Sequence, residues 1–311
     1  MFDIVSVGNF SIDSICLPHR QNAFTVLGGS VAYVSFAARV LEAQTSVISR
    51  VGTDFPAAYK WWLQQEGVDL SGLVVIQGMP TTRFELKYEN DLSDRTLRSR
   101  TRMSPIQLDD LHISLKAKII HLAPIAGEIT FEVAEKLRNC AEVISLDPQG
   151  LIRNFDGDGN VTLESPPDTR VLNLIDIFKS TPKEIQTLTG SEDTETAIQT
   201  VHKRGARMVI VTLGAEGALV SVDDATHKVP AYTPEKLIDP TGAGDAFIGA
   251  FLAEYSKGED CAWCAYVGSA AASLVVEGIG PTSFGDKNQI YQRAHVLFDK
   301  REQKNNSNKN A

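Results

Sequence analysis

Short apolar runs rich in β-branched residues alternate with helical patterns along most of this 311-residue chain. The predicted strands are Asp3–Gly8, Thr45–Val51, Ile119–Leu122, Val143–Leu146, Asp176–Lys179 and Met208–Thr212. The predicted helices between them are Val31–Leu41, Ala57–Gln65, Ile129–Asn139, Lys183–Thr189 and Thr194–Lys203. Strands that alternate with helices form right-handed crossovers between parallel strands. The sequence therefore predicts an α/β fold with a mainly parallel sheet covered on both faces.

One region interrupts this alternation. Leu73–Gln77, Thr82–Asn90 and Thr96–Arg102 have the composition of short strands with polar turns, and no helix lies between them. Apolar and charged residues alternate within the second of these segments, as in a half-buried strand. The pattern predicts a small antiparallel sheet that serves as a lid. A plain surface excursion is the alternative, and the basic residues of the region do not decide between the two.

The charge balance disfavours two classes of partner. The formal net charge is −9 and the pI about 5.2, which argues against nucleic acid and anionic membrane surfaces. No apolar run approaches the ~18–20 residues that cross a bilayer, and the N-terminus lacks a signal-peptide pattern. Four cysteines do not form a disulfide framework in a chain this long, so we expect a cytoplasmic protein. We expect one domain over residues 1–298 and a disordered polar tail over 299–311.

Two glycine-containing segments are weak candidates for a phosphate site. Gly280–Gly285 has the spacing of a Walker A loop, but Asp286 stands where that loop needs a lysine, so we reject this interpretation. Val211–Gly217 ends a predicted strand, and its glycines permit close approach of a ligand to the backbone. A turn and hairpin explains the second segment equally well. No Gly-x-Gly-x-x-Gly motif supports a dinucleotide enzyme.

A third segment, Asp239–Phe247, reads Asp-Pro-Thr-Gly-Ala-Gly-Asp-Ala-Phe and precedes a run of small apolar residues typical of a buried helix. Gly242, Ala243 and Gly244 thus fall in a first helical turn, where unpaired N–H groups and the helix dipole form an anion site. Asp245 lies in the same turn. Carboxylates favour helix N-termini in any case, but this one directly follows glycines that admit a ligand. A base beside an anion site suits phosphoryl transfer to a hydroxyl.

The third segment resembles the C-terminal signature of the ribokinase-like, or PfkB, carbohydrate kinases. Weaker matches to this family, persuasive together, are Gly8–Asp13, Gly28-Gly29, Val51–Phe55 and Thr212–Gly217. The resemblance covers most of the chain. It implies a three-layer α/β/α fold with a small β-sheet lid, which we place at about residues 10–25 and 73–103.

The resemblance also implies roles for single residues. Asp245 would be the general base that takes the proton of the acceptor hydroxyl, and its positioning would matter more than its basicity because the transition state is loose. Gly242, Ala243 and Gly244 would stabilise charge on the transferring phosphoryl group. The acceptor would be bound by Asp13, Gly28, Gly29, Tyr33 and Arg153.

The cofactors implied by the resemblance are ATP and Mg²⁺, with K⁺ as a candidate monovalent cation. The residues that would contact ATP are Lys179, Thr212, Gly214 and Gly217. Glu184 would organise Mg²⁺ through water. Asp239 and Thr241, with carbonyl groups of Val276–Ser283, would bind the monovalent cation. A homodimer formed through the lid is a further expectation.

Two positions depart from the family pattern. Thr181 replaces the asparagine of an Asn-x-x-Glu motif, and since its hydroxyl can donate a hydrogen bond, we expect Mg²⁺ binding to survive. Tyr33 replaces an asparagine that contacts a sugar. Tyr33, Asp147–Arg153 and Phe178–Glu184 together resemble the branch that contains the myo-inositol kinases. Asp147–Arg153 is otherwise interpreted as a strand-end loop with an exposed arginine.

The sequence therefore predicts an ATP-dependent kinase that phosphorylates a hydroxyl of a small polyol or sugar. A nucleoside kinase of the same fold is the nearest alternative. A non-catalytic ligand-binding regulator is a third, but a degenerate protein of that kind would be expected to lose the base or the anion site. Asp245, Gly242 and Gly244 are all present.

Overall fold

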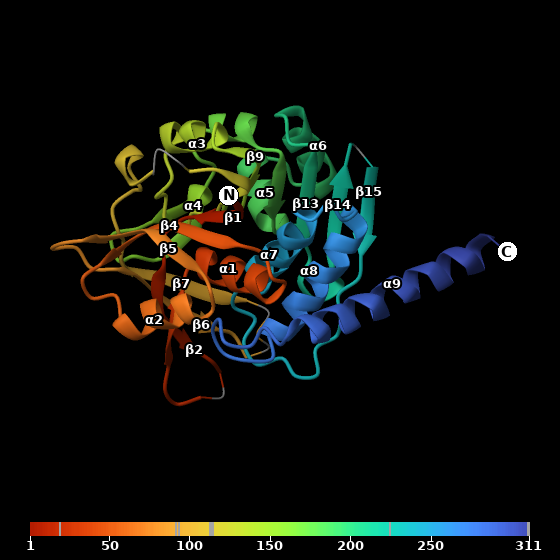
Figure 1. Ribbon diagram of the computed structural model, residues 1–311, viewed down its shortest axis with the longest axis horizontal. Helices are drawn as coiled ribbons and strands as arrows, with labels where there is room; N and C mark the ends of the chain where they lie inside the picture. Colours follow the sequence, from red (N-terminus) through yellow and green to blue (C-terminus); the bar gives the residue numbers. More distant parts are fainter. Residues whose placement is uncertain (19, 91, 93, 112–114, 224, 310–311) are drawn as a thin grey trace.

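The computed structural model describes residues 1–311 except 19, 91, 93, 112–114, 224 and 310–311. A nine-stranded sheet forms its centre, in the order β15-β14-β13-β12-β9-β8-β1-β4-β5 (Figure 1). The strands are β1 (Phe2–Val7), β4 (Thr45–Gly52), β5 (Asp69–Ile76), β8 (Ala117–Leu122), β9 (Ala141–Leu146), β12 (Ile177–Ser180), β13 (Met208–Thr212), β14 (Ala218–Val222) and β15 (Ala225–Val229). Neighbours from β13 to β5 are parallel, and β14 and β15 add an antiparallel edge. The predicted mainly parallel sheet is confirmed.

Helices cover both faces of the sheet. One face carries α1 (Ser30–Val40), α2 (Ala57–Gln65), α7 (Ala243–Tyr255), α8 (Cys261–Val275) and α9 (Lys287–Lys309). The other carries α3 (Phe131–Arg138), α5 (Pro182–Thr189) and α6 (Thr194–Lys203). Because side chains alternate across a strand, β1 sends Ile4 into the first core and Val5 and Val7 into the second. The three-layer α/β/α prediction is confirmed.

Four strands form a second, smaller sheet in the order β3-β2-β6-β7. They are β2 (Ser11–Cys16), β3 (Phe24–Gly28), β6 (Thr82–Tyr88) and β7 (Arg95–Thr101). Apolar side chains of this sheet, among them Ile15, Phe84 and Leu86, pack with Ile125, which follows β8 of the large sheet. We call this small sheet the lid, and the rest of the protein the body.

Two details of the predicted lid are wrong. Leu73–Gln77 is not part of it, because β5 pairs in parallel with β4 at the edge of the large sheet, where its backbone groups find their hydrogen-bond partners. The lid is also mixed rather than antiparallel, since β2 and β6 run parallel. An apolar run predicts a strand, but it does not predict which sheet the strand joins.

Short elements complete the fold. They are the helix α4 (Gln149–Ile152), the hairpin strands β10 (Arg153–Phe155) and β11 (Val161–Leu163), and the 3₁₀ helices η1 (Leu108–Asp110), η2 (Arg170–Leu174) and η3 (Gly214–Glu216). Helix α9 runs to Lys309, so the backbone is helical over residues 299–309, where we expected a disordered tail. Many of these residues are good helix formers, and extending a packed helix costs less than nucleating one.

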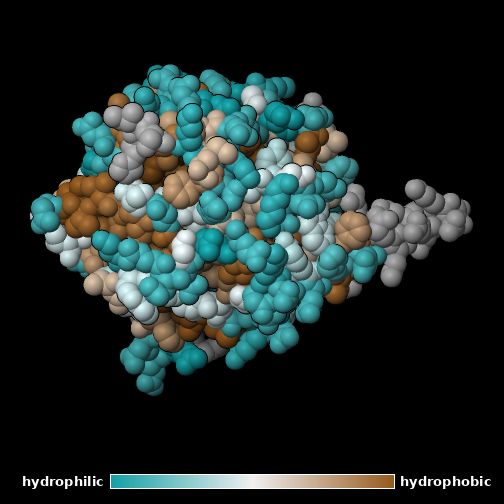
Figure 2. Space-filling view, in the orientation of Figure 1, coloured by the Kyte–Doolittle hydropathy of each residue, from teal (hydrophilic) through white to brown (hydrophobic). Residues whose placement is uncertain are grey.

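The face of the molecule shown in Figure 2 is hydrophilic apart from one exposed apolar area. Figure 2 shows mainly hydrophilic residues, with a hydrophobic area at the left of the view, on the side where Figure 1 labels β4 and β5. Val75 of the edge strand β5 is 45% exposed. In the described part of the chain, no helix combines the length and the hydropathy needed to cross a bilayer. Cys16, Cys140, Cys261 and Cys264 are free thiols.

Candidate active site

The residues of the candidate site gather where the parallel strands of the large sheet end. Asp147 follows β9, Lys179 lies on β12, and Thr212 ends β13. Helix α7 begins beside this edge, and the lid lies across it with Asp13 on β2. Carboxyl ends of parallel strands are the usual ligand sites of open α/β sheets.

The N-terminus of α7 has the geometry of an anion site. Gly242 caps the helix at φ 79°, without a side-chain cap. The N–H of Ala243 bonds to the Pro240 carbonyl at 3.3 Å. Among the described residues, no acceptor contacts the N–H groups of Gly244 and Asp245. These donors are therefore available to an anion.

Asp245 stands in this first turn of α7. Burial raises the pKa of its carboxyl group to about 6, against the positive charge of Lys179 and a hydrogen bond from Ser30, which lower it. A carboxylate with a raised pKa binds a proton more readily than an ordinary aspartate. Asp245 is therefore suited to accept a proton near neutral pH.

Lys179 supplies a cation beside the same turn. Its Nζ donates to Oδ2 of Asp147 at 2.6 Å, and the two side chains are 5% and 1% exposed. A Cβ placed on Gly244 would lie 2.7 Å from Nζ, so the glycine lets the ammonium reach the helix. Burial lowers the pKa of Lys179, but Asp147, Asp245 and Glu184 together raise it above its usual value. The lysine stays protonated.

A small cavity of about 50 Å³ lies between the lid and the body. The predicted site residues that line it are Asp13, Gly29, Tyr33, Arg153, Thr241, Gly242 and Asp245. We call it the acceptor cavity. Oδ1 of Asp13 and the hydroxyl of Tyr33 are both buried and lack a hydrogen-bond partner among the described residues. Unpaired buried polar atoms are costly, so a ligand with hydroxyl groups would fit here.

Two glycines make room for Asp13 and Tyr33. A Cβ on Gly28 would overlap the Asp13 carboxylate, and a Cβ on Gly242 would overlap the Tyr33 ring. Gly29 has φ 89° and caps α1, as expected for a Gly-Gly pair that opens a helix. Burial raises the pKa of Asp13 to about 6, against the nearby Ser11 hydroxyl and the positive charge of Arg95, which lower it.

A chain of hydrogen bonds links Arg153 to the base. Nη1 of Arg153 donates to the Ile125 carbonyl at 2.9 Å, and Nη2 donates to Oε1 of Gln149 at 2.5 Å. Nε2 of Gln149 donates to Oγ of Ser30 at 2.5 Å. Ser30 is also the residue that hydrogen-bonds Asp245. Arg153 is thus a held, partly buried side chain and not the exposed arginine of a plain loop.

The predicted ATP and Mg²⁺ residues lie farther along the sheet edge. Oγ1 of Thr212 donates to the Ser180 carbonyl at 3.3 Å, and Gly214 and Gly217 adopt φ of 59° and 95° around η3. Thr181 and Glu184 form a capping box at the start of α5, where Oε2 of Glu184 accepts from the Thr181 N–H at 2.7 Å. The threonine therefore acts as a helix cap.

The turn before α7 is tied to the lid. Oδ1 of Asp239 accepts from the Thr241 N–H at 2.9 Å and from its hydroxyl at 2.5 Å, and Oδ2 accepts from the Gly280 N–H at 3.3 Å. The Thr241 hydroxyl also bonds to the Tyr88 hydroxyl at 2.7 Å, which accepts from Nη1 of Arg95 at 2.7 Å. The lid strands β6 and β7 thereby contact the predicted cation turn.

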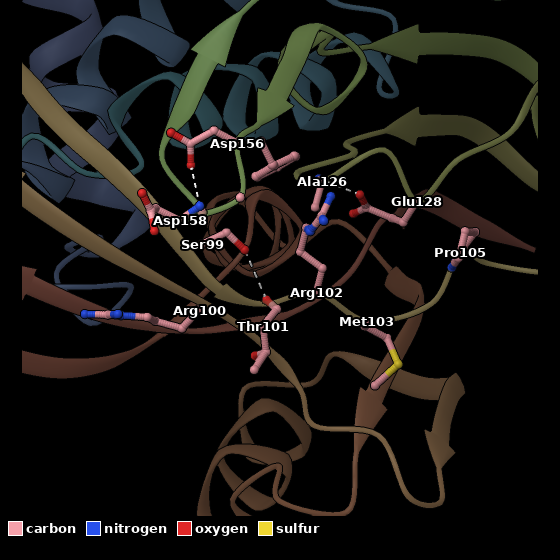
Figure 3. Close-up of a pocket in the computed structure, with 13 residues that line it drawn as sticks. Ser99, Arg100, Thr101, Arg102, Met103, Pro105, Ala126, Glu128, Asp156 and Asp158 are labelled. Atoms are coloured by element: carbon pink, nitrogen blue, oxygen red, sulfur yellow. Dashed lines mark hydrogen bonds between the residues drawn. The ribbon is translucent and has the colours of Figure 1, made fainter.

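A larger open cavity of about 600 Å³ lies next to the acceptor cavity, between β7, the Ala126–Glu128 turn and the β10–β11 hairpin. Figure 3 shows Arg102, which directly follows β7, pointing toward Ala126 and Glu128, while Arg100 points away. The Arg102 guanidinium lies 4.4 Å from the Phe155 ring centroid, and Phe155 stacks on Phe84 of the acceptor cavity at 6.4 Å. The two aromatic rings therefore separate the two cavities.

Sequence reasoning missed several residues of the site. Asp147 and Gln149 stood in a motif that we noted, but their partners Lys179 and Ser30 become visible only in three dimensions. Arg95 was one of several basic residues of the lid, and no local pattern distinguished it. Its contact with Tyr88 depends on the lid folding over the body.

The parallel sheet, its lid and the carboxylate at a helix N-terminus define a class, the ribokinase-like fold. A solved pyrophosphate-dependent kinase in the ribokinase family, complexed with a pyrophosphate analog and myo-inositol, superposes with a TM-score of 0.80. The superposition covers 93% of this chain and 99% of that one, at 22% identity, which shows the shared fold.

Residues 1–288 match the pfkB family carbohydrate kinase, and the chain belongs to that family. It is 30% identical to a cytidine kinase of Thermococcus kodakarensis over 293 residues, 91% of this chain and 99% of the relative. It is 29% identical to an inositol 3-kinase of Oryza sativa over 296 residues, 90% of this chain and 70% of the relative. The kinase class predicted from the sequence is confirmed.

Proposed function

We propose that the protein transfers the γ-phosphoryl group of ATP to a hydroxyl of a small polyol or sugar. One observation carries this proposal: the Asp245 carboxylate stands in the same helical turn as the unpaired N–H groups of Gly244 and Asp245, beside the ammonium of Lys179. A proton acceptor and an anion site share one place, as phosphoryl transfer to a hydroxyl requires.

In the proposed reaction the acceptor hydroxyl gives its proton to Asp245, and its oxygen forms a bond to the γ-phosphorus. The bond from that phosphorus to the bridging oxygen breaks, and ADP leaves with the electron pair. The N–H groups of α7 and the ammonium of Lys179 offset the charge on the other phosphoryl oxygens. Asp13 and Tyr33, whose buried polar atoms are unpaired, hold the acceptor through its hydroxyls.

Side-chain oxygen atoms of the body are suited to bind the two cations that we expect, Mg²⁺ and a monovalent cation. Glu184 uses Oε2 in the capping box, which leaves Oε1 to accept from water bound to Mg²⁺, a cation that shields phosphate charge. Asp239 accepts three hydrogen bonds, which leaves about one of its four lone-pair sites for a weak ligand contact. With Thr241 beside it, this turn would accept a monovalent cation such as K⁺. Thr212, Gly214 and Gly217 would contact the nucleotide.

A nucleoside is the second candidate acceptor. The Thermococcus relative is a cytidine kinase, while the Oryza relative is an inositol 3-kinase. The acceptor cavity of about 50 Å³ favours the smaller class, because a nucleoside would have to displace the lid strands much farther. The unpaired Asp13 and Tyr33 atoms in its mixed polar and apolar lining also suit a ligand with several hydroxyl groups.

Asp245→Asn tests the proposal. We expect kcat for ATP-dependent phosphorylation to fall about 10²–10⁴-fold, the usual contribution of a general base, while acceptor binding persists. ADP release would be measured with inositol, ribose, fructose, adenosine and cytidine, and each acceptor would also be offered with pyrophosphate. Asp109→Asn, at an exposed aspartate of η1, is the matched control. Wild-type turnover by Asp245→Asn rules out the assigned base, and turnover of nucleosides alone rules out a polyol or sugar acceptor.

The assembly and the compartment are further parts of the proposal. We infer a homodimer formed through the lid, and light scattering would then give a mass near twice the 33.9 kDa of the chain. A mass equal to one chain would contradict the dimer. The four free thiols suit a reducing compartment, so we place the protein in the cytoplasm.

A further inference from the structure

A segment without helix or strand leads into the candidate active site. Residues 230–241 connect the edge strand β15 to the start of α7. At the end of this segment, the N–H groups of Ile238 and Asp239 donate to the Val276 carbonyl at 2.8 and 3.2 Å. We call residues 230–241 the approach segment. Its position determines where the first turn of α7 begins.

Glu277 holds the middle of the approach segment. Its Oε1 accepts from the Glu235 N–H at 2.7 Å. Within the described chain, this is the only hydrogen bond that residues 231–237 form. Val276, whose carbonyl holds the end of the segment, directly precedes Glu277. Two consecutive residues after α8 therefore fix both the middle and the end of the approach segment.

Arg293 of α9 orients Glu277. Its Nη1 and Nη2 donate to Oε1 and Oε2 of the glutamate at 2.9 and 3.1 Å, a bidentate pair. Nη1 also donates to the Ser273 hydroxyl at 2.9 Å, and the guanidinium lies 4.8 Å from the ring centroid of Tyr232 in the approach segment. The arginine and glutamate side chains are only 11% and 20% exposed. Arg293 thus contacts the segment once directly and once through Glu277.

The ionised state of Glu277 depends on these contacts. Burial raises its pKa, but the hydrogen bonds from Arg293 and from the Glu235 N–H hold the pKa below its usual value. Without the arginine, a partly desolvated carboxylate would lack its counter-charge, which is unfavourable. We expect the Glu277 side chain then to turn toward water, and the approach segment to lose the bond at its middle.

Packing of α9 does not require this ion pair. Ile290, Ala294 and Leu297 already bury the helix against the core. Apolar contacts stabilise a helix without the cost of desolvating two charges. The pair adds a connection from α9 to the approach segment. Arg293 also lies beyond residue 288, where the match to the family ends, so that match does not account for it.

We infer that Arg293 is a positioning residue of the candidate active site. Through Glu277 and Tyr232 it fixes the approach segment, and the segment places the first turn of α7, since the Ala243 N–H donates to the Pro240 carbonyl. The C-terminal helix therefore helps to form the anion site, although it contributes no atom to it. The effect on catalysis rests on the proposed kinase function.

Arg293→Gln tests the inference. Hydrogen exchange would be measured on the full chain without ligand, and kcat with the acceptor that the wild type phosphorylates best. We expect exchange over residues 232–241 to become at least fivefold faster and kcat to fall at least fivefold, because the anion site loses its fixed position. Arg293→Lys should recover part of both, since an ammonium lacks the planar fork. Unchanged exchange, or unchanged kcat in an active enzyme, would overturn the inference.

Two controls on α9 separate positioning from stability. Leu297→Ala removes a buried apolar side chain, and Lys287→Gln breaks an ion pair with Glu42. Leu297→Ala should lower the melting temperature at least as much as Arg293→Gln but leave kcat within twofold, measured well below that temperature. Lys287→Gln should change kcat no more than this. An equal loss of kcat in Leu297→Ala would mean that lost stability explains the effect, and would rule out positioning.

A charge swap tests whether the pair only attaches α9 to the α8 region. Arg293→Glu combined with Glu277→Arg keeps opposite charges at the two positions. An arginine at position 277 has no acceptor for the Glu235 N–H, so the approach segment stays without its bond. We expect the double variant to recover the melting temperature lost in the single variants, but not kcat. Full recovery of kcat would contradict the inference.

Hydrogen exchange also separates this inference from the kinase proposal, because it needs no turnover. If no acceptor is phosphorylated, the kinase proposal fails. Faster exchange of the approach segment in Arg293→Gln, with both controls unchanged, would still support the positioning role. If the wild type is an active kinase and exchange in Arg293→Gln is unchanged, the inference fails and the kinase proposal stands.

Discussion

Gly242 shows how one residue joins the helix cap to the acceptor cavity. Its φ of 79° is strained for any residue with a Cβ, and that Cβ would overlap the Tyr33 ring. We therefore expect Gly242→Ala to lower both the melting temperature and kcat, because the ring and the first turn of α7 must both shift. Thermal denaturation and steady-state kinetics would measure the two effects.

Gly258→Ala is the control for Gly242→Ala. Gly258 has a similar φ of 88°, but no atom lies within 4 Å of the position of a Cβ. Gly258→Ala should lower the free energy of unfolding only by the strain of the left-handed conformation, about 1–2 kcal/mol. It should leave kcat unchanged. Equal losses of kcat in the two variants would show that contact with Tyr33 does not position the turn.

The raised pKa of Asp245, about 6, predicts how activity depends on pH. Only the ionised carboxylate accepts a proton, so kcat/KM should fall about tenfold per pH unit below about 6 and level off above it. His121 does not contribute to this inflection, because burial lowers its pKa to about 4 and it stays neutral, whereas Asp13, with a pKa of about 6, titrates in the same range as Asp245. A pH profile from 5 to 8 checks the prediction, and a flat profile would contradict it.

As pH rises, the stability of the folded state should decrease through the range in which activity increases. Asp13 and Asp245 have folded-state pKa values of about 6, above the 3.8 of an aspartate in an unfolded chain. Between those values the folded state binds more protons than the unfolded state, so both groups lower stability as pH rises through this window. The melting temperature of Asp245→Asn should therefore depend less on pH than that of the wild type.

At the scale of single residues, the sequence could predict a site residue when the other residues of its motif are adjacent to it in the chain. Gly242, Gly244 and Asp245 form their anion site within one helical turn. Tyr33 was predicted to bind the acceptor and was noted as a departure from the family pattern, but its neighbours in the fold were not predicted. Its packing on Gly242 joins α1 to α7, and no local pattern encodes such a contact.

The β10–β11 hairpin is the element that attaches the lid to the body at the edge of β7. The Ser99 N–H donates to the Gly159 carbonyl at 2.7 Å, and Nε of Arg98 donates to the Asp158 carbonyl at 2.8 Å. The hairpin begins at Arg153 of the acceptor cavity. A movement of the lid would therefore also move the hairpin and Arg153, which we predict to bind the acceptor.

Gly159→Ala tests this attachment. Gly159 has φ 84°, and a Cβ there would overlap the Ser99 carbonyl, so the substitution should detach the hairpin from β7. We expect faster hydrogen exchange over residues 95–101 and a several-fold higher acceptor KM. Gly157→Ala, in the same turn with no atom within 4 Å of a Cβ, should change neither. Unchanged exchange in Gly159→Ala would show that the hairpin does not hold the lid.

Helices and strands with a strong hydrophobic periodicity could be predicted from the sequence. Elements of only a few residues could not. The strands of the parallel core and the helices α1, α2, α3, α5 and α6 lie where the patterns put them. The strands β10 and β11 have three residues each, too few for a period-2 pattern. The edge strand β5 was assigned to the lid because its partner β4 is set by the tertiary fold.

At the scale of the whole molecule, the C-terminal helix α9 packs into the core of the α/β body. Ile290, Ala294 and Leu297 of α9 are buried against the helices of the first face. Arg293 reinforces this packing through bonds to Ser273 and Glu277 of the α8 region. The match to the family ends at residue 288, inside α9, so it does not by itself mark the end of the folded unit.

Two truncations locate that end. Deleting residues 287–311 removes three buried side chains, each worth about 1.5–3 kcal/mol if large and fully buried, from a stability of about 5–15 kcal/mol. It should prevent folding or lower the melting temperature strongly. Deleting residues 299–311 removes a polar stretch and should shift the melting temperature by about 2 °C or less, with kcat unchanged. A large loss of stability in the shorter truncation would contradict a domain that ends at residue 298.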